Sequence, residues 1–297
     1  MTKSTTRETA DVANIAGRRN LIINGGFDVW QQGTSQTGSG RKTVDRWYGA
    51  NPGAMAKDVD ATGNPILKFT TNGHVDPYLF TVIEDGVRIL RGKTVTFSCY
   101  IKSEHPDPIQ FLYLRQYGTG GALVGKATMD SSESGWDRYV FTTTIPESWT
   151  ANDHLFTDIE FTGGMTADIW VKNVQLEVGS VATDFDHRSY GEELALCQRY
   201  YQRVTGKFTS QGTRWVGEYF GSYYMPVTMR SAPAFLGSRP AMLKAFGAGA
   251  SLDSTAVVAG EAGISSIELQ MTGGSVGTSA FLRFGASTDW FSLDAEL

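Results

Sequence analysis

Short apolar segments separated by turn residues fill most of this 297-residue sequence. In the segment KTVTFSCYIKS, apolar side chains occupy every second position: Val95, Phe97, Cys99 and Ile101. A period of two is the pattern of a β-strand with one buried face. Between residues 20 and 186 no segment of useful length follows the helix period, which argues against parallel strands joined by helices. The sequence therefore predicts an all-β fold, with an antiparallel jelly-roll β-sandwich over 20–186.

Composition supports a turn-rich protein with two domains. Glycine makes up 34 of the 297 residues, about 11% against a typical ~7%, and charged residues make up only 19%. A domain usually takes roughly 100–200 residues, and strand-like segments resume after residue 203. We therefore expect a small C-terminal β-sandwich domain over 204–297. Its core of about 90 residues is marginal unless it is shared.

One segment, residues 187–203, follows the helix period instead. Ser189 and Glu192 have the S-x-x-E spacing of a capping box. Two adjacent apolar stripes follow, one made by Tyr190, Leu194, Cys197 and Tyr201 and the other by Leu196 and Tyr200. At 100° per residue the two stripes together span roughly 160°, wider than an ordinary surface helix shows. We expect a linking helix that packs on the sandwich with one stripe, and on the C-terminal domain or on symmetry mates with the other.

Several classes of partner are excluded by charge and by missing segments. The net charge is −5, and no basic run exists beyond Arg18-Arg19 and Arg41-Lys42, so nucleic acid is not expected as a partner. No stretch approaches ~18 continuous apolar residues, so membrane insertion is not expected. The N-terminus lacks the apolar core of a secretory signal, which predicts folding in a reducing cytosol. Cys99 and Cys197 form no CxxC motif and are expected to be buried as small apolar side chains.

Catalytic motifs are missing as well. The sequence contains no G-x-S-x-G and no H-E-x-x-H motif, and its four histidines have no ligand-like spacing. A glycosidase needs two opposed carboxylates, which spacing alone cannot reveal. Acid pairs such as Glu84-Asp85 are typical of solvated turns. We therefore expect no enzyme activity and no cofactor.

The first 19 residues differ from the rest because they are polar and permit a short helix. TTRETADVANIAG has Thr5 or Thr6 as an N-cap and Gly17 as a stop. Alone, such a helix is marginal in water. Residues 1–19 are therefore either a frayed terminus or an attachment arm that orders on a partner.

The most specific motifs lie at the two ends of the predicted sandwich. They are NLIINGGFDVWQQGTS followed by VDRWYG, and IWVKNVQLEVGSVATDFDHRSYGEELALCQRYYQ. VTFSCYIKSE and GWDRYVFTTTIP keep their order between them, and MPVTMRSAPAF and the terminal DAEL follow. This arrangement resembles bacteriophage tail-fibre and receptor-binding proteins, with a carbohydrate-binding-module-like jelly roll and a small C-terminal β domain. The resemblance covers about residues 20–297, and it is strongest at 20–50 and 165–203.

The resemblance implies a non-enzymatic virion protein, usually a homotrimer, that contacts a bacterial surface polysaccharide. Residues 1–19 would attach to other virion proteins, and 204–297 would trimerise or form the tip. The protein would be made in the host cytoplasm and located in the virion, in a tail fibre or a head fibre. Two alternatives remain: a head-attached fibre or decoration protein with a structural role, and a capsule-degrading depolymerase. Depolymerases usually carry long β-helices, and no internal repeat of 20–50 residues occurs here.

Aromatic side chains are the candidate glycan contacts, because sugar rings stack on them while polar neighbours bond the hydroxyls. Trp30, Trp47 and Trp136 lie in regular segments and are expected in the core. The candidates for carbohydrate binding are Trp149, in a polar loop, and Trp215, Tyr219, Tyr223, Tyr224 and Trp290, in the C-terminal domain. Aromatic residues at a trimer interface would show the same pattern, so both roles remain open.

Two sequence patterns could indicate a calcium-binding site. DVDATGN begins at Asp58 and copies the first half of a calcium loop, but Phe69 stands where the bidentate glutamate belongs. We therefore expect a plain hairpin turn there. The resemblance separately implies a structural calcium between the acid after NG-x-F and an acid in the last strand. Those positions hold Asp28 and Asn173, and the asparagine departs from the family's acid.

Overall fold

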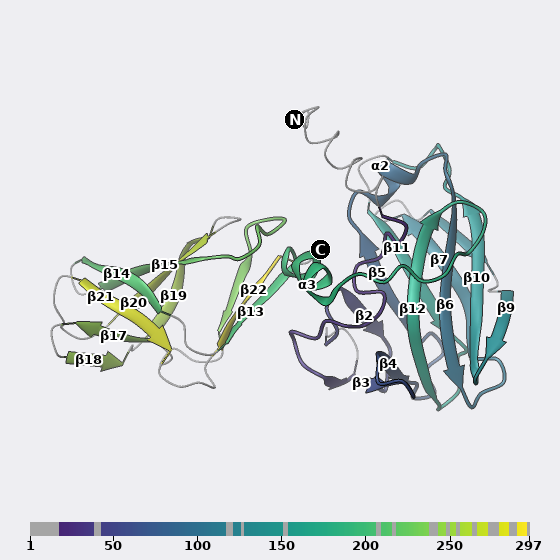
Figure 1. The fold of residues 1–297 in the computed structure, drawn as a ribbon, viewed down its shortest axis with the longest axis horizontal. Coiled ribbons are helices and arrows are strands. Elements are labelled where there is room, and N and C mark those ends of the chain that lie inside the picture. The colour runs from purple at the N-terminus through teal and green to yellow at the C-terminus, as the bar shows by residue number, and fades with distance from the viewer. Residues whose placement is uncertain are drawn as a thin grey trace. The chain divides into compact units, whose positions relative to one another are not determined.

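The computed structural model describes residues 18–295 with short gaps. The gaps are 39–42, 117–120, 126–127, 151–153, 206–208, 216–217, 238–242, 248–249, 254–255, 263–265, 273–278 and 285–289. For most strands after Thr205 only the course of the backbone is described. The predicted arm therefore lies outside the described residues, apart from Arg18 and Arg19. Two compact units, Met1–Glu193 and Leu194–Leu297, make up the chain (Figure 1).

The N-terminal unit is a sandwich of two antiparallel sheets. In spatial order, the seven-stranded sheet contains β1 (Ser35–Thr37), β3 (Ala54–Val59), β4 (Pro65–Thr70), β12 (Asp168–Val178), β6 (Thr94–Ser103), β10 (Trp136–Thr144) and β9 (Thr128–Glu133). The five-stranded sheet contains β2 (Trp47–Ala50), β5 (Tyr78–Ile83), β11 (Leu155–Phe161), β7 (Ile109–Gln116) and β8 (Ala122–Gly125). The chain passes repeatedly from one sheet to the other, as in a jelly roll, which confirms the predicted fold class.

The core lies between the two sheets and follows the period-two pattern. All four apolar positions of the segment that predicted β6 are buried, including the free thiol of Cys99. From the opposite sheet, Leu112 and Leu114 of β7 enter the same cluster. Across the sandwich, the rings of Phe69 and Phe161 lie 4.6 Å apart between centroids. Trp47 is fully buried and Trp136 is nearly so, as predicted.

The C-terminal unit contains two further antiparallel sheets. The smaller consists of β13 (Tyr201–Thr205), β22 (Trp290–Asp294) and β16 (Ala234–Gly237). The larger consists of β18 (Ala250–Asp253), β17 (Leu243–Gly247), β21 (Ser279–Phe284), β14 (Thr209–Trp215), β15 (Glu218–Tyr224), β20 (Ser266–Thr272) and β19 (Ala256–Ala262). The expectation of β structure after residue 203 is thus confirmed.

The described residues contain two helices, α2 (Gly86–Leu90) and α3 (Tyr190–Gln198), and neither has the length and apolar character to cross a membrane. Helix α3 is shorter than the predicted 187–203. The amide of Tyr200 donates to the Cys197 carbonyl at 2.9 Å, which closes a turn, and the chain then enters β13. Tyr201 is therefore a strand residue paired with Asp294.

The predicted apolar arc of this helix needs correction too. Cys197, Tyr200 and Tyr201 are buried, whereas Leu194 and Leu196 are only half-buried. Tyr190 is 61% exposed, so the stripe predicted to begin there is not covered at its first residue. The apolar contacts of the segment are thus concentrated at its C-terminal end, where the helix turns into a strand.

The start of α3 is held by a buried ion pair. Ser189 caps the helix, because its hydroxyl accepts a hydrogen bond from the amide of Glu192 at 3.3 Å. Glu193 pairs with Arg188 at 3.1 Å, and both side chains are only 6% exposed. The same carboxylate accepts a hydrogen bond of 2.6 Å from the amide of Asn24, in the N-terminal NGG turn. One glutamate therefore joins two segments that lie 169 residues apart.

We expect Glu193→Gln to lower the free energy of unfolding by about 3 kcal/mol, because the buried Arg188 cation then loses its counter-charge. The neighbouring Glu192 provides a matched control, since its side chain is 45% exposed and pairs with the partly exposed Arg18. Glu192→Gln should cost less than about 0.5 kcal/mol. Urea denaturation followed by tryptophan fluorescence measures both variants, and equal small losses would contradict the role given to the buried pair.

Candidate functional site

The outer face of the five-stranded sheet carries aromatic and charged side chains instead of a simple polar surface. In β7, Leu112 and Leu114 point into the core. Because strand side chains alternate, Phe111, Tyr113 and Arg115 lie on the opposite face. The same alternation places further residues on this outer face: Tyr48 from β2, Tyr78 and Phe80 from β5, and Phe156, Asp158 and Glu160 from β11.

Strand register brings these side chains together in rows across the sheet. In one row Tyr48 lies opposite Phe80, Phe80 opposite Asp158, and Asp158 opposite Tyr113. Flanking rows pair Tyr78 with Glu160, Glu160 with Phe111, and Phe156 with Arg115. The buried Asp158 carboxylate is therefore surrounded by aromatic side chains, with Arg115 and Glu160 in the flanking rows.

A hollow of about 360 Å³ opens on this face. Its lining consists of Asp76, Tyr78, Tyr113, Arg115, Asp158 and Glu160. The volume falls in the ~300–1,000 Å³ range of small-molecule sites. All six residues belong to the N-terminal unit, and five of them lie on β-strands, which hold side chains more rigidly than loops do.

The floor of the hollow is an ion pair. Arg115 donates through Nε to Oδ2 of Asp158, whose residue is only 2% exposed. Burial raises the pKa of Asp158 to about 6, although Arg115 opposes the shift. Burial lowers the pKa of Arg115, but the Asp158 carboxylate outweighs it and the net shift is upward. Oδ1 of Asp158 is also buried and has no hydrogen-bond partner within the described residues.

Aromatic rings support the charged groups around this floor. The Arg115 guanidinium lies 5.8 Å from the ring centroid of Tyr78 and 5.5 Å from that of Phe156. Such cation–π contacts hold a long side chain in one orientation. The Tyr113 hydroxyl is hydrogen-bonded to Glu160, and burial together with that carboxylate raises the pKa of Tyr113. The polar groups of the hollow are thus held in place before any ligand arrives.

The aromatic residues singled out in the sequence do not form this site. Trp149 is only 8% exposed and belongs to the core cluster, so it cannot stack on a sugar from solution. In the C-terminal unit, Tyr224 is 77% exposed and Tyr223 is half-buried, and burial raises the pKa of Tyr223. Trp215, Tyr219 and Trp290 lie on β14, β15 and β22, and their own side chains are outside the described part of the chain.

A sequence signal for the observed hollow does exist, but it is distributed over three strands. A strand that buries one face against a core normally shows small or polar residues on the other. YLFTVI, IQFLYLRQ and LFTDIEF instead carry aromatic residues on the outer face, and the second and third of them carry charged residues there as well. Recognising the site requires the pairing of strands that are distant in sequence, and a single sequence does not reveal that pairing.

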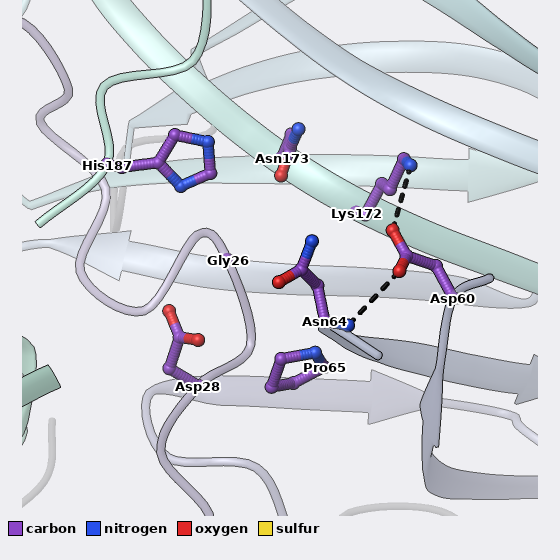
Figure 2. Close-up of a pocket in the computed structure, with 8 residues that line it drawn as sticks. All are labelled: Gly26, Asp28, Asp60, Asn64, Pro65, Lys172, Asn173 and His187. Carbon is purple, nitrogen blue, oxygen red and sulfur yellow. Dashed lines mark hydrogen bonds and ion pairs between the residues drawn. The ribbon is translucent and has the colours of Figure 1, made fainter. Parts of the chain in front are cut away.

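A second, smaller pocket brings the predicted calcium residues together. It measures about 130 Å³ and is lined by Gly26, Asp28, Asp60, Asn64, Pro65, Lys172, Asn173 and His187. Figure 2 shows Asp28 at one end of the pocket and the Lys172–Asp60 ion pair at the other, with Asn64 between them. Burial raises the pKa of Asp28, against the opposing charges of His187 and Lys57.

The side chains of this second pocket do not suit calcium. Calcium takes six to eight oxygen ligands, largely from carboxylates. One oxygen of Asp60 is 3.2 Å from Lys172 Nζ, and the other accepts hydrogen bonds from Thr62 and Asn64. Asp28 is the carboxylate that remains in the lining, and the Lys172 ammonium repels a cation. Across the described residues, no group of three or more acidic, histidine or cysteine side chains is arranged to hold a metal.

The DVDATGN run forms the predicted hairpin turn between β3 and β4. The Asp60 amide donates to the Asn64 carbonyl at 2.9 Å, and the Gly63 amide donates to the Asp60 carbonyl at 2.9 Å. Hydrogen bonds from Thr62, then from Asn64 and Lys172, lower the pKa of Asp60 to about 2. The Asp60 side chain thus stabilises the turn, whereas the Asp58 carboxylate accepts a hydrogen bond from the Trp170 indole at 2.9 Å.

No protein-family model matches the chain, and no curated protein matches it. Solved structures are similar over about half of it. The enzymatically active domain of tailspike protein 4 from bacteriophage CBA120 is 12% identical over 54% of this chain and 21% of its own, with a TM-score of 0.34. The xylan-binding CBM22-1 domain of Paenibacillus barcinonensis Xyn10C is 15% identical over 55% and 96%, with a TM-score of 0.34. TmCBM61, solved in complex with β-1,4-galactotriose, is 12% identical over 55% and 100%, with a TM-score of 0.35. This chain thus spans about a fifth of the tailspike domain, and likenesses of this size do not bear on what it binds.

We expect calcium to leave the stability of the N-terminal unit unchanged, because Lys172 already supplies the positive charge of the second pocket. Thermal unfolding in millimolar calcium and after exhaustive chelation should agree within about 1 °C. A bound ion at 100 times its Kd would instead add about 2.7 kcal/mol, which is several degrees. A calcium-dependent rise in Tm that disappears in Asp28→Asn would contradict this expectation.

The raised pKa of Asp158 predicts a specific pH dependence. A carboxyl with a folded pKa of about 6 and an ordinary value of 3.8 holds its proton longer in the folded state. Stability therefore falls as pH rises between about 4 and 6, by up to ~1.4 kcal/mol per pH unit from this group. Asp158→Asn should remove that part of the pH profile in urea denaturation. Asp76→Asn, at the exposed rim, should leave the profile as it is in the wild type.

Proposed function

We propose that the outer face of the five-stranded sheet binds a bacterial surface glycan without catalysing a reaction, and that the protein is a phage virion fibre or receptor-binding protein. The observation that carries the glycan proposal is the hollow with Tyr78 and Tyr113 in its walls and the Arg115–Asp158 pair at its floor. Aromatic surface next to a few fixed polar groups is the general composition of a small-ligand site.

The chemistry of the hollow matches both properties of a sugar ring. Aromatic side chains cover the apolar CH surface of the ring, which removes that surface from water. Each sugar hydroxyl can donate and accept a hydrogen bond, and the partly exposed Glu160 carboxylate and Arg115 guanidinium of the hollow supply acceptor oxygens and N–H donors. Because Arg115 is fixed by Asp158 and by two rings, little side-chain entropy is lost when a sugar binds.

Binding without chemistry is favoured over a depolymerase by the state of the two carboxylates. Asp158 and Glu160 share a strand face two residues apart, as a glycosidase pair could. Asp158, however, is covered and its Oδ2 is held by Arg115, so it has no freedom to protonate a glycosidic oxygen or to attack a sugar. A reducing-end assay on host polysaccharide tests this alternative, and released ends would overturn the non-enzymatic proposal.

The assignment to a virion is supported by the two motif segments that resemble tail-fibre proteins. These segments contact each other: the amide of Val174 donates to the Gly25 carbonyl at 2.9 Å, and a Cβ on Gly25 would lie 2.1 Å from the Val174 oxygen. The amide of Asn24 also donates to the Glu193 carboxylate. Hydrogen bonds thus connect the glycine turn both with β12 and with the first turn of α3. In this proposal residues 1–19 bind other virion proteins, and the C-terminal unit trimerises or forms the tip.

We expect Tyr78→Ala and Tyr113→Ala each to weaken binding to the host glycan about tenfold or more, because each removes an aromatic wall. Tyr224→Ala is the control, since Tyr224 is the most exposed of the aromatic candidates from the sequence whose side chains are described. Isothermal titration, or adsorption of labelled protein to host cells, measures all three variants. Loss of binding in Tyr224→Ala alone would move the receptor site to the C-terminal unit. Absence of binding to every host strain would favour a structural head fibre or decoration protein.

We also expect the purified protein to be a homotrimer at micromolar concentration. The C-terminal unit of about 90 residues gains stability if its core is shared between chains. Light scattering coupled to size-exclusion chromatography gives the mass directly. With a chain of 32.4 kDa, a stable monomer peak would rule the trimer out.

A further inference from the structure

The side chains that line the hollow carry more negative charge than positive charge. Among the described residues of the lining, Asp76, Asp158 and Glu160 carry negative charge once Asp158 is ionised, and Arg115 carries the one positive charge. No lysine or histidine occurs among these described residues. Above pH 6 the hollow therefore holds two surplus negative charges.

Arg115 is poorly placed to compensate for an anionic ligand. Its Nε is bound to Asp158, so the charge of one cancels that of the other. Its guanidinium lies over the rings of Tyr78 and Phe156. A sugar carboxylate that approached Arg115 would meet Asp158 and Glu160 on the neighbouring strand at the same time.

We infer that the hollow selects uncharged sugar units and excludes acidic ones such as uronic and sialic acids. The inference rests on the proposed glycan-binding function and specifies its ligand class. Like charges a few ångströms apart repel strongly where water is partly excluded, and such repulsion is a general device for rejecting wrong partners. A carboxylate added to a bound sugar should weaken binding at least about tenfold.

Lysines lie beside an aromatic ring on the opposite sheet of the same unit. There, Lys68 and Lys102 lie 5.4 and 5.8 Å from the ring centroid of Trp170. On that face Lys68 also pairs with Asp168 at 2.8 Å, and the Trp170 indole donates to Asp58 at 2.9 Å, so cations and carboxylates are both present around the ring. The variants described next change residues of the hollow. Any binding at the face around Trp170 therefore does not obscure the result.

The test uses a panel of host-surface polysaccharides together with polygalacturonate and hyaluronan, each acidic member in its native form and after carboxyl reduction. Reduction changes a uronate into the corresponding neutral sugar and leaves the linkages intact. The full-length protein is titrated with each form at low and at physiological salt. We expect binding among the neutral or reduced members, at least about tenfold tighter than to the native acidic forms. Salt should narrow this difference because it screens the repulsion.

Glu160→Gln removes one surplus charge, leaves the Arg115–Asp158 pair in place and keeps an oxygen for Tyr113. In this variant the ratio of affinities for the reduced and the native acidic polysaccharide should fall several-fold. Glu192→Gln makes the same change in net charge outside the hollow and should leave the preference unaltered. A native acidic polysaccharide that binds as tightly as its reduced form, and loses binding in Tyr78→Ala, would overturn the inference while the proposed function stands. No binding to any member of the panel would overturn both.

Discussion

The two faces of each strand in the five-stranded sheet meet separate requirements, and this constraint organises the N-terminal unit. The inner face of β7 must be apolar to hold the sandwich together, and Leu112 and Leu114 meet that requirement. The outer face contributes nothing to the shared core, so its residues are free to serve another purpose. Tyr113 and Arg115 on this outer face line the hollow. The fold and the hollow therefore depend on the same alternation of side chains along the strand. The inner face supplies the core, and the outer face supplies the hollow.

The Arg115–Asp158 pair is not the arrangement that would give the highest free energy of unfolding. Removing two charges from water is expensive, and apolar residues of similar volume are often at least as stabilising as a buried ion pair. Here the pair is also incomplete, because Oδ1 of Asp158 has no hydrogen-bond partner within the described residues. A buried acceptor without a partner destabilises the protein. Within the described residues the Arg188–Glu193 pair also contains a buried atom without a partner, Nε of Arg188, but its carboxylate accepts a further hydrogen bond from the amide of Asn24.

The sequence pattern predicted those features that depend on residues close together in the chain. The period-two run that contains Cys99 predicted a strand and its buried face, and the hairpin after Asp58 followed from turn chemistry. The end of α3 could not be predicted, because Tyr201 fits a helical stripe equally well until pairing with β22 draws it into a strand. Trp149 was misjudged for a related reason: its loop is polar in sequence, but the indole is buried by the core cluster. The hollow was missed because Arg115 and Asp158, 43 residues apart, become neighbours only through strand register.

Two pockets among the described residues of the N-terminal unit differ in how their carboxylates are held. Each contains a carboxylate paired with a cation of the chain, Asp158 with Arg115 and Asp60 with Lys172. Their pKa shifts run in opposite directions, to about 6 for Asp158 because burial dominates, and to about 2 for Asp60 because hydrogen bonds dominate. Asp60 is thus fully occupied within its turn and gains nothing from a ligand. Asp158 is buried beside aromatic rings and keeps one oxygen without a partner in the described residues, so the same kind of ion pair stabilises a turn in one pocket and lies in the hollow proposed to bind a ligand in the other.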